Sequence, residues 1–542
     1  MMEDNDSWEA FEAVWQANLD VELEAAFGYG CVCDDDFELD DDAQEPGGDA
    51  HKEPAAEAAQ MADPEPETTA SFTNGRRWPL LRGEVGELLV VAEDADVFRG
   101  DDGLNYARVP TRFGSATWRL ESPDFEGWLA FRFMSADQVT VADGDVKSAI
   151  KVIGQWCRHE GRVLPVALRV AQGDGVLWLD LGDETGEAVA ITQDGWSVTD
   201  NPPVCFQRPA GMGPLPRPER GGTLKLLGKH FNVDDDDRTL LTAWLLACLR
   251  PDAPQVILSL SSSQGSAKSS AAGLLCRVID PGAAVLKALP PNEAAILAAA
   301  ERRYVLAFDN TSALSLSMSD ALCRMSTGSA RVRLVGKQEV AATLRRPVIL
   351  TGIVDLIRRP DLADRALRVE LRPIDGMGRR TQEDIQAAFA ADHPRILGAL
   401  LDAAVAGLCR LPGVTGSLPR MADFARWVFA CAPAFTDTGN LRALLAENQL
   451  SVSGDILDED PLGGALRRLL LDAPEWSGTA SHLLAALRRV TPKGEGRLPT
   501  RPEQLSSGLR RIEEDLRRHG MTIKRDRIGN AGTRMIFLRA AV

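Results

Sequence analysis

Apolar runs alternate with helical stretches through the middle of the chain. Residues 256–260 (VILSL) suit a buried strand, a small-residue loop follows, and KSSAAGLLCRVI then has the spacing of a helix. After a helix-like stretch at 292–302, two further apolar runs occur, YVLAF at 304–308 and PVILT at 347–351. Short apolar runs separated by helices are typical of buried strands in an α/β domain. We therefore predict an α/β core here.

The N-terminal flank of this core shows weaker and shorter patterns. Residues 145–158 have helical spacing, and short β-like runs alternate with Gly and Asp turns, which predicts a mixed α+β domain. The β-like runs are Glu87 to Ala92, Val166 to Val170, Gly175 to Leu181 and Ala188 to Thr192. Residues 239–249 (TLLTAWLLACL) form an apolar helix pattern behind the aspartates 234–237. Because these acids lack metal-ligand spacing, helix capping explains them better than a metal site.

The C-terminal flank is helical at first. Residues 380–450 have helical spacing broken by Gly and Pro, which predicts a lid-like bundle. Helical stretches at 479–490 and 502–519 then precede two β-like runs, 521–525 and 534–539, around a Gly-containing turn. Two helices followed by a two-stranded ribbon give the outline of a winged helix.

Charge separates the two ends of the chain. The 542 residues carry a net charge of −19, and residues 1–70 hold 22 Asp or Glu against the single basic residue Lys52. Trp8, Phe11, Trp15 and Leu19 recur at helical spacing in this acidic tail, which predicts one short amphipathic helix in an otherwise disordered segment. A solvated spacer is the simplest interpretation. The alternatives are docking on a replication partner or covering of a basic DNA-binding face.

Cysteine usage and hydropathy favour one compartment. Nine cysteines are scattered without a C-x-x-C pair, and only six histidines accompany them, so a zinc site is not expected. The chain has no N-terminal hydrophobic run and no stretch of 18 uninterrupted apolar residues. We expect a cytoplasmic protein that does not bind membranes.

The loop after residues 256–260 carries the clearest chemistry. SSSQGSAKSS fits the phosphate-binding pattern G-x-x-x-x-G-K-S/T at Gly265, Lys268 and Ser269, while Ser262 and Ala267 replace the two glycines. Ala267 is a mild change if its φ is negative, whereas Ser262 stands where glycine usually takes a conformation that a side chain resists. The residues expected to contact nucleotide are Gln264, Gly265, Ser266, Ala267, Lys268, Ser269 and Ser270. A Ser/Gly-rich turn without ligand is about equally compatible with the loop alone.

Polar residues at the ends of the next apolar runs strengthen the nucleotide hypothesis. Asp309 ends one run and Thr351 the next, and Arg365 follows. In a ring-forming ATPase, Asp309 and Ser269 would hold Mg²⁺, Thr351 would sense the γ-phosphate, and Arg365 would reach the nucleotide of a neighbouring subunit. Asn310 stands where a water-activating glutamate is common. Asp320 and Glu301 are the nearest acids in sequence that could replace it.

Several segments together resemble a known family. SSSQGSAKSS, KALPPNEAAILAAAERRYVLAFDN, RRPVILTGI, RPDLADRALRVEL, PRILGALLDAAVAGL and PRMADFARW are similar to ATP-binding proteins of bacterial phages, plasmids and integrated elements. Those proteins resemble the helicase half of primase–helicases, with a superfamily-3 or AAA+-like P-loop core. The resemblance covers about residues 80 to 542 and implies ATP and Mg²⁺ as cofactors. The loop departs from the family's usual GEQGSGKS/T, and Thr351 stands for a strand-end asparagine.

Basic residues in two places suggest DNA contacts. ARVRLVGKQEV at 330–340 has the alternation of a hairpin, and the resemblance implies that such a hairpin enters the channel of a ring. The candidate contacts are Arg331, Arg333 and Lys337 in the hairpin, Ser506, Ser507, Arg510 and Arg511 on the helix at 502–519, and Lys524, Arg525, Arg527 and Arg534 in the ribbon. A solvated hairpin and a protein-docking winged helix are the plain alternatives.

The sequence thus predicts five parts: an acidic tail (1–77), a mixed α+β domain (78–215), a P-loop core (222–378), a helical bundle (379–460) and a basic winged-helix-like domain (461–542). The predicted function is an ATP-binding and ATP-hydrolysing, helicase-like motor that acts on DNA in the replication of a phage or mobile element, as a homo-oligomeric ring. The alternative is an inactive P-loop DNA-binding adaptor that recruits partners through its acidic tail.

Overall fold

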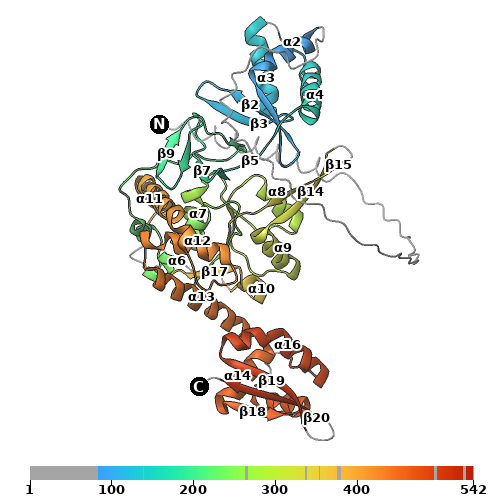
Figure 1. Cartoon of the computed structure of the whole chain (residues 1–542), viewed down its shortest axis with the longest axis vertical. Coiled ribbons are helices and arrows are strands. Elements are labelled where there is room, and N and C mark those ends of the chain that lie inside the picture. Colours follow the sequence, from blue (N-terminus) through green and yellow to red (C-terminus); the bar gives the residue numbers. More distant parts are fainter. Residues whose placement is uncertain are drawn as a thin grey trace, which may run out of the picture. The chain divides into compact units, whose positions relative to one another are not determined.

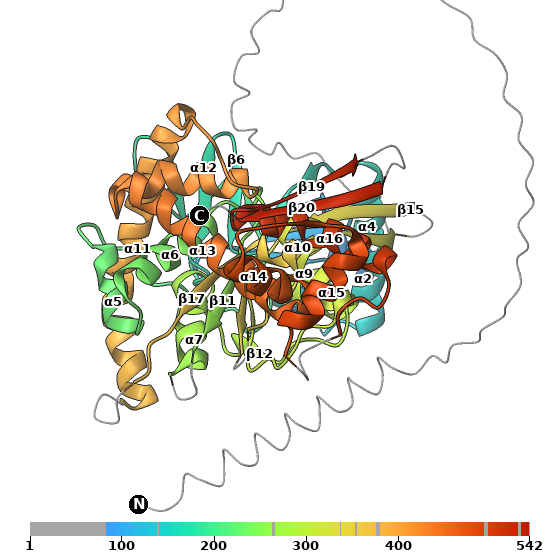
Figure 2. The same cartoon turned by 90° about the horizontal axis from the view of Figure 1, so that it is seen from below.

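The computed structural model describes residues 83–137, 140–262, 266–335, 338–352, 355–374, 380–492, 497–528 and 533–540. The predicted amphipathic helix and acidic tail lie outside these residues. Figure 1 and Figure 2 label the helices and strands in two views.

The first described part is a mixed sheet with helices on one face, in which three strands run antiparallel and the fourth joins in parallel. Three helices supply the core that covers the strands, through Leu88, Phe125 and Ile153 among others. The elements are α2 (Glu84–Val91), β1 (Asp96–Gly100), β2 (Asn105–Pro110), β3 (Ser115–Arg119), α3 (Pro123–Asp137), α4 (Asp143–His159) and β4 (Val163–Leu164). The strand predicted at Glu87 to Ala92 is wrong. Glu84 and Glu87 occupy the first turn of α2, where acids favour a helix N-terminus, and Leu88 and Leu89 are buried against α4.

A meander of four short strands follows and packs on the central core. Its members are β6 (Val170–Gly173), β7 (Val176–Asp180), β8 (Ala188–Ile191) and β9 (Trp196–Thr199), while β5 (Val166–Ala167) pairs with β10 (Cys205–Phe206). Residues 214–222, which follow this meander, are not a free linker. The Glu219 N–H donates to the Pro394 carbonyl at 2.9 Å, and Gly398 leaves no room for a Cβ beside the Glu219 carbonyl. This segment therefore lies against a core helix.

A five-stranded parallel sheet forms the centre of the protein. Its strand order is β12-β13-β16-β11-β17, and every neighbouring pair is parallel. The strands are β11 (Ile257–Ser261), β12 (Leu286–Lys287), β13 (Leu306–Phe308), β16 (Val348–Thr351) and β17 (Ala366–Glu370). These strands are apolar and largely buried because helices cover both faces. The predicted α/β core is therefore present, with all five carboxyl ends at one edge.

Helices and one hairpin complete the central part. The helices are η2 (Leu224–Leu226), α5 (Leu227–His230), α6 (Asp235–Ala247), α7 (Lys268–Ile279), α8 (Glu293–Ala300), α9 (Leu316–Thr327) and α10 (Pro360–Ala363). Asp234 caps α6, since its side chain accepts the Asp237 N–H, which confirms the capping interpretation of these acids. The predicted hairpin is confirmed as β14 (Ser329–Val335) paired antiparallel with β15 (Gln338–Leu344).

A helical bundle follows the sheet. Its long members are α11 (Gln382–Arg410), α12 (Ala422–Cys431) and α13 (Thr438–Glu459). Among the described residues, the stretch Gln382–Gly413 is long and apolar enough to cross a membrane by length and composition alone. Half of its most apolar window is buried inside the protein, as expected of a core helix, so this is weak evidence for a span.

The last part is built on its own core of leucines. The elements are α14 (Pro461–Asp472), β18 (Glu475–Gly478), α15 (Ala480–Val490), α16 (Pro502–Arg518), β19 (Met521–Ile528) and β20 (Thr533–Ala540). Figure 2 shows β19 and β20 side by side, and β18 pairs with β20 to complete the sheet β18-β20-β19. The helices and the ribbon match the sequence prediction, while α14 and β18 are additions to it.

Candidate functional site

The loop between β11 and α7 begins the site. Among its described residues, Ala267 directly precedes the first residue of α7, Lys268, and has φ 60° and ψ 38°, a left-handed conformation. Alanine in place of glycine would be mild only with negative φ, so the change at Ala267 is not mild. Ser262 is not among the described non-glycine residues with positive φ, so the strain expected there lies at Ala267 instead. The candidates Gln264 and Gly265 lie outside the described residues.

Lys268 contacts the start of its own loop. Its Nζ donates to the Ser262 carbonyl at 3.1 Å and lies 3.0 Å from the Ser262 Oγ. The Ser262 hydroxyl also contacts the Ser266 hydroxyl. The side chain that replaces the first glycine of the pattern therefore serves as a partner for the lysine.

Three other candidates meet at the carboxyl edge of the sheet. Asp309 follows β13 and Thr351 ends β16, so both lie at the same edge as the loop after β11. The Ser269 Oγ donates to Asp309 Oδ1 at 3.0 Å, and the buried Thr351 hydroxyl donates to the same carboxylate. The fold therefore brings Ser269, Asp309 and Thr351, three of the residues predicted from the sequence, into contact.

The same oxygens suit Mg²⁺. Adjacent ligands of an octahedral Mg²⁺ lie about 2.9 Å apart, since each Mg–O bond is about 2.05 Å. The Ser269 and Asp309 oxygens are 3.0 Å apart. The described residues hold no group of three or more His, Cys, Asp or Glu side chains placed for a metal. An ion here would take its other ligands from phosphate and water, which is the usual manner of Mg²⁺.

Asn310 extends the same cluster through its backbone. Its φ is 51°, and its N–H donates to the Thr351 Oγ1 at 3.0 Å, while its side chain is exposed. Two other acids were candidates for the same task. Asp320 pairs with Arg359, and Glu301 precedes β13, so it lies at the opposite end of that strand from Asp309.

A cavity of about 650 Å³ adjoins the loop. Its walls come from residues 228–232, from the start of α7 with Ala267, Ser270 and Leu274, and from described residues beyond β17, namely Leu371, Pro373, Ile374, Arg380, Gln382 and Ile385. The His230 side chain in this wall is buried, its Nε2 lies 3.0 Å from Asp392 Oδ2, and burial lowers its pKa. The size is in the range of small-molecule sites. Nothing in the local sequence pattern identified this cavity, because its walls come from distant segments.

Arg365 lies where the parallel strands begin, at the edge of the sheet opposite the carboxyl ends. It directly precedes β17, and its carbonyl accepts the N–H of Ile257, the first residue of β11, at 2.9 Å. Since β11 has 5 residues, roughly 15 Å of strand separates Arg365 from the loop. Arg365 therefore does not join the cluster of its own chain.

The candidate DNA contacts divide into two groups. Lys337 and the side chains of Arg331 and Arg333 lie outside what the structure describes. In the last part of the chain, Arg511 pairs with Asp460 at 2.5 Å and Arg525 with Glu513 at 2.8 Å. Among the described residues, the exposed candidates that form no ion pair are Ser507, Arg510, Lys524, Arg527 and Arg534. Ser506 is half-buried, and its hydroxyl donates to the Pro502 carbonyl at 3.0 Å.

Solved structures and curated proteins were compared with this chain. Two of the solved structures that match are apo forms of the "NrS-1 C terminal region", at 12% and 11% identity with TM-scores of 0.41 and 0.39. Each covers 84% of this chain and 98% of its own. No curated protein matches the sequence.

Two family models match in succession. Residues 225–458 match the family described as "Actinomycete integrative conjugative element replication protein". Residues 462–541 match the "AICE RepA C-terminal domain". Both stretches thus match models of replication proteins from actinomycete integrative conjugative elements, and we conclude that the chain is a replication protein of a mobile element.

Proposed function

We propose that this replication protein binds and hydrolyses ATP with Mg²⁺ and acts as a helicase-like motor on the DNA of its mobile element. The observation that carries the proposal is the contact of Ser269 with Asp309 and of Asp309 with Thr351, from three separate elements at one edge of a parallel sheet. Ligands of open α/β sheets bind at this edge, and helix N-termini favour phosphate. A P-loop core of the AAA+-like kind accounts for this arrangement.

Each residue has a definite task in this proposal. When nucleotide binds, Lys268 would give up its contacts with Ser262 and bind the β- and γ-phosphates. Ser269 and Asp309 would hold Mg²⁺. The Thr351 hydroxyl, fixed by the Asn310 N–H at 3.0 Å, would orient the attacking water near Asp309. The ion would supply charge neutralisation at the phosphates. The cavity of about 650 Å³ beside the loop would take the base and ribose.

The last part of the chain is the proposed DNA-binding element, with the α14-β18-α15-α16-β19-β20 order of a winged helix. In its ribbon, Arg527 lies directly opposite Arg534, and both are exposed. Like charges in facing positions destabilise a ladder, and a bound phosphate would relieve this repulsion. Lys524 and Arg510 would add further phosphate contacts.

The site is tested by ATP turnover with and without single-stranded DNA. We expect slow turnover that DNA stimulates, and Lys268→Ala should lower it by about 100-fold or more, as for loss of a group that stabilises transition-state charge. Lys147→Ala on α4 is the control, because this residue lies in the N-terminal sheet domain. Equal turnover in wild type and Lys268→Ala would overturn the motor proposal.

A second candidate is an adaptor that binds DNA and nucleotide without hydrolysis. The left-handed Ala267 and the amide of Asn310 favour it, because an amide cannot take a proton from water. Absent turnover together with intact DNA binding would support this candidate over the motor.

A further inference from the structure

Asp364 is a buried carboxylate that joins three parts of the chain. It is 5% exposed and ends α10, directly before Arg365. It accepts hydrogen bonds from Arg420 before α12, from Gln449 on α13 at 2.7 Å and from Arg518 at the end of α16 at 2.7 Å. A buried carboxylate with charged donors is held firmly, so these contacts fix the end of α10.

Arg365 itself is held less firmly than its neighbour. Its Nη1 donates to the Asp361 carbonyl at 2.5 Å, and its Nε is buried without a hydrogen-bond partner. Arg365, Asp364 and Arg518 also line a common cavity of about 510 Å³. The position of the Arg365 guanidinium therefore depends on the elements around this cavity, including α16.

Helix α16 connects this cavity to the proposed DNA face. Ser507 and Arg510 are exposed in its first half, while Arg518 at its end is 25% exposed and turned to Asp364. The hydrogen bond to Asp364 raises the pKa of Arg518 above its ordinary value, so the contact stays charged. His519 adds a contact of 3.2 Å from its Nε2 to the Leu450 carbonyl on α13.

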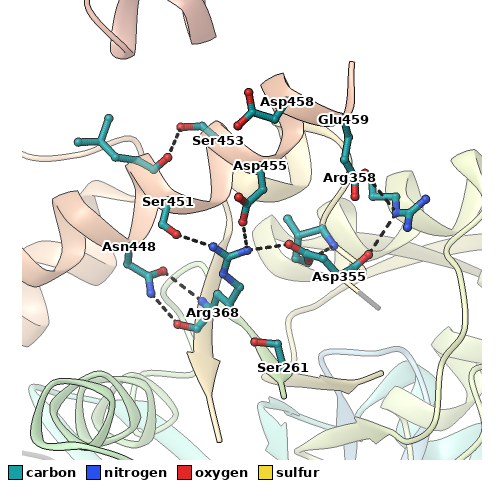
Figure 3. A network of polar contacts seen from close by, with 12 residues as sticks. Ser261, Asp355, Arg358, Arg368, Asn448, Ser451, Ser453, Asp455, Asp458 and Glu459 are labelled. Carbon is teal, nitrogen blue, oxygen red and sulfur yellow. Dashed lines mark hydrogen bonds and ion pairs between the residues drawn. The ribbon is translucent and has the colours of Figure 1, made fainter. Parts of the chain in front are cut away.

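Helix α13 is in turn tied to the parallel sheet. Figure 3 shows Arg368 of β17 between Asp355 and Asp455, with Asn448 beside its backbone. The guanidinium donates to Asp355 at 2.8 Å and to Ser451 at 2.5 Å, and it also contacts Asp455. Asn448 bonds both the N–H and the carbonyl of Arg368, at 3.1 and 2.6 Å. Contacts of α16 therefore reach α10, which precedes Arg365, directly, and β17, which follows Arg365, through α13.

We propose that Arg518 is a positioning residue through which DNA bound on α16 sets Arg365 for the nucleotide of a neighbouring copy. The inference rests on the proposed ATPase function. In this proposal Arg518 acts through Asp364 and not on the nucleotide directly. The Arg518–Asp364 contact therefore controls how far DNA accelerates turnover, while nucleotide affinity is left to the loop and cavity at the opposite sheet edge.

The test compares Arg518→Gln with Arg517→Gln in the full chain. Arg517 precedes Arg518, is 69% exposed and pairs only with Glu514 among the described residues, so its variant has the same charge change without loss of the Asp364 contact. For Arg518→Gln, DNA stimulation of turnover should fall by about tenfold, a usual size for coupling between two sites. The Kd for ATP and for DNA should stay within about twofold of wild type. Arg518→Lys should restore part of the stimulation, because it keeps the charge.

Three results separate the inference from the function it rests on. No turnover in the wild type would remove the ATPase proposal and the inference with it. Full DNA stimulation in Arg518→Gln, with an active wild type, would overturn the inference alone. An equal loss of DNA stimulation in Arg517→Gln would show a general structural effect and would also overturn the inference. A much weaker binding of ATP by Arg518→Gln would do the same.

Discussion

Left-handed backbone at two non-glycine residues marks the candidate site. Ala267, directly before Lys268, has φ 60°, and Asn310, directly after Asp309, has φ 51°. A side chain in this conformation costs about 1–2 kcal/mol, and such strain gathers at ligand-binding sites. The phosphate-binding pattern has a glycine directly before the lysine. Ala267 takes this place and keeps a left-handed backbone, so its Cβ causes the strain.

Ala267→Gly should therefore stabilise the protein. Relief of the left-handed strain is partly offset by the flexibility of glycine in the unfolded chain, which leaves a gain of about 0.5–1 kcal/mol. Ala271→Gly, one turn into α7, is the control and should destabilise by about 1 kcal/mol, because glycine is a poor helix former. Thermal unfolding checks the opposite signs. A loss of stability in Ala267→Gly would contradict the strain argument.

Contacts between residues were predictable only where strand ends fix them. Asp309 and Thr351 were chosen because each ends an apolar run, and parallel strands bring such ends to one edge. The Lys268–Ser262 contact was missed, since the pattern gives only a position for glycine. Asp364 and Arg518 are 154 residues apart, and no local signal joins them.

At the scale of elements, the acids at the start of α6 lower the stability of the folded protein once Asp237 is charged. Burial raises the pKa of Asp237 from 3.8 to about 6, and Asp234 adds to the effect. Its carboxylate accepts the N–H of Glu370 at the end of β17, at 3.2 Å. The folded protein therefore binds a proton here that the unfolded chain has lost, so stability falls as pH rises from about 4 to about 6.

Asp237→Asn should remove this pH dependence, because the amide keeps an acceptor for Glu370 and carries no charge. The variant should melt above the wild type at about pH 8, and the difference should shrink at about pH 5. Asp236→Asn, at an exposed neighbouring position, should show little change between the two pH values. A variant less stable than wild type at the higher pH would contradict the assigned cost.

Elements with a strong period were predicted well, and the short, mixed ones were not. The apolar runs ending at Leu260, Phe308 and Thr351 became β11, β13 and β16, because buried parallel strands need continuous apolar residues. The run Glu87 to Ala92 suits a strand by composition, yet it forms part of α2, because packing against α4 decides a short segment. Strand β18 is held by its register with β20, which lies far away in sequence.

At the scale of the whole molecule, the two edges of the parallel sheet differ. Lys268, Ser269, Asp309 and Thr351 lie at the carboxyl edge, and Arg365 lies at the other. One copy holds these groups apart, whereas a head-to-tail ring of copies would join one edge to the other. Our proposal therefore requires an active site that is shared between copies.

The most direct test of this account is ATP turnover by an equimolar mixture of Lys268→Ala and Arg365→Ala in the presence of single-stranded DNA. Each variant alone should be inactive. In mixed assemblies, a chain with Lys268 meets a neighbour with Arg365 at about a quarter of the interfaces, so about a quarter of wild-type turnover should return. A mixture as inactive as its two components, beside an active wild type, would contradict a site shared between copies.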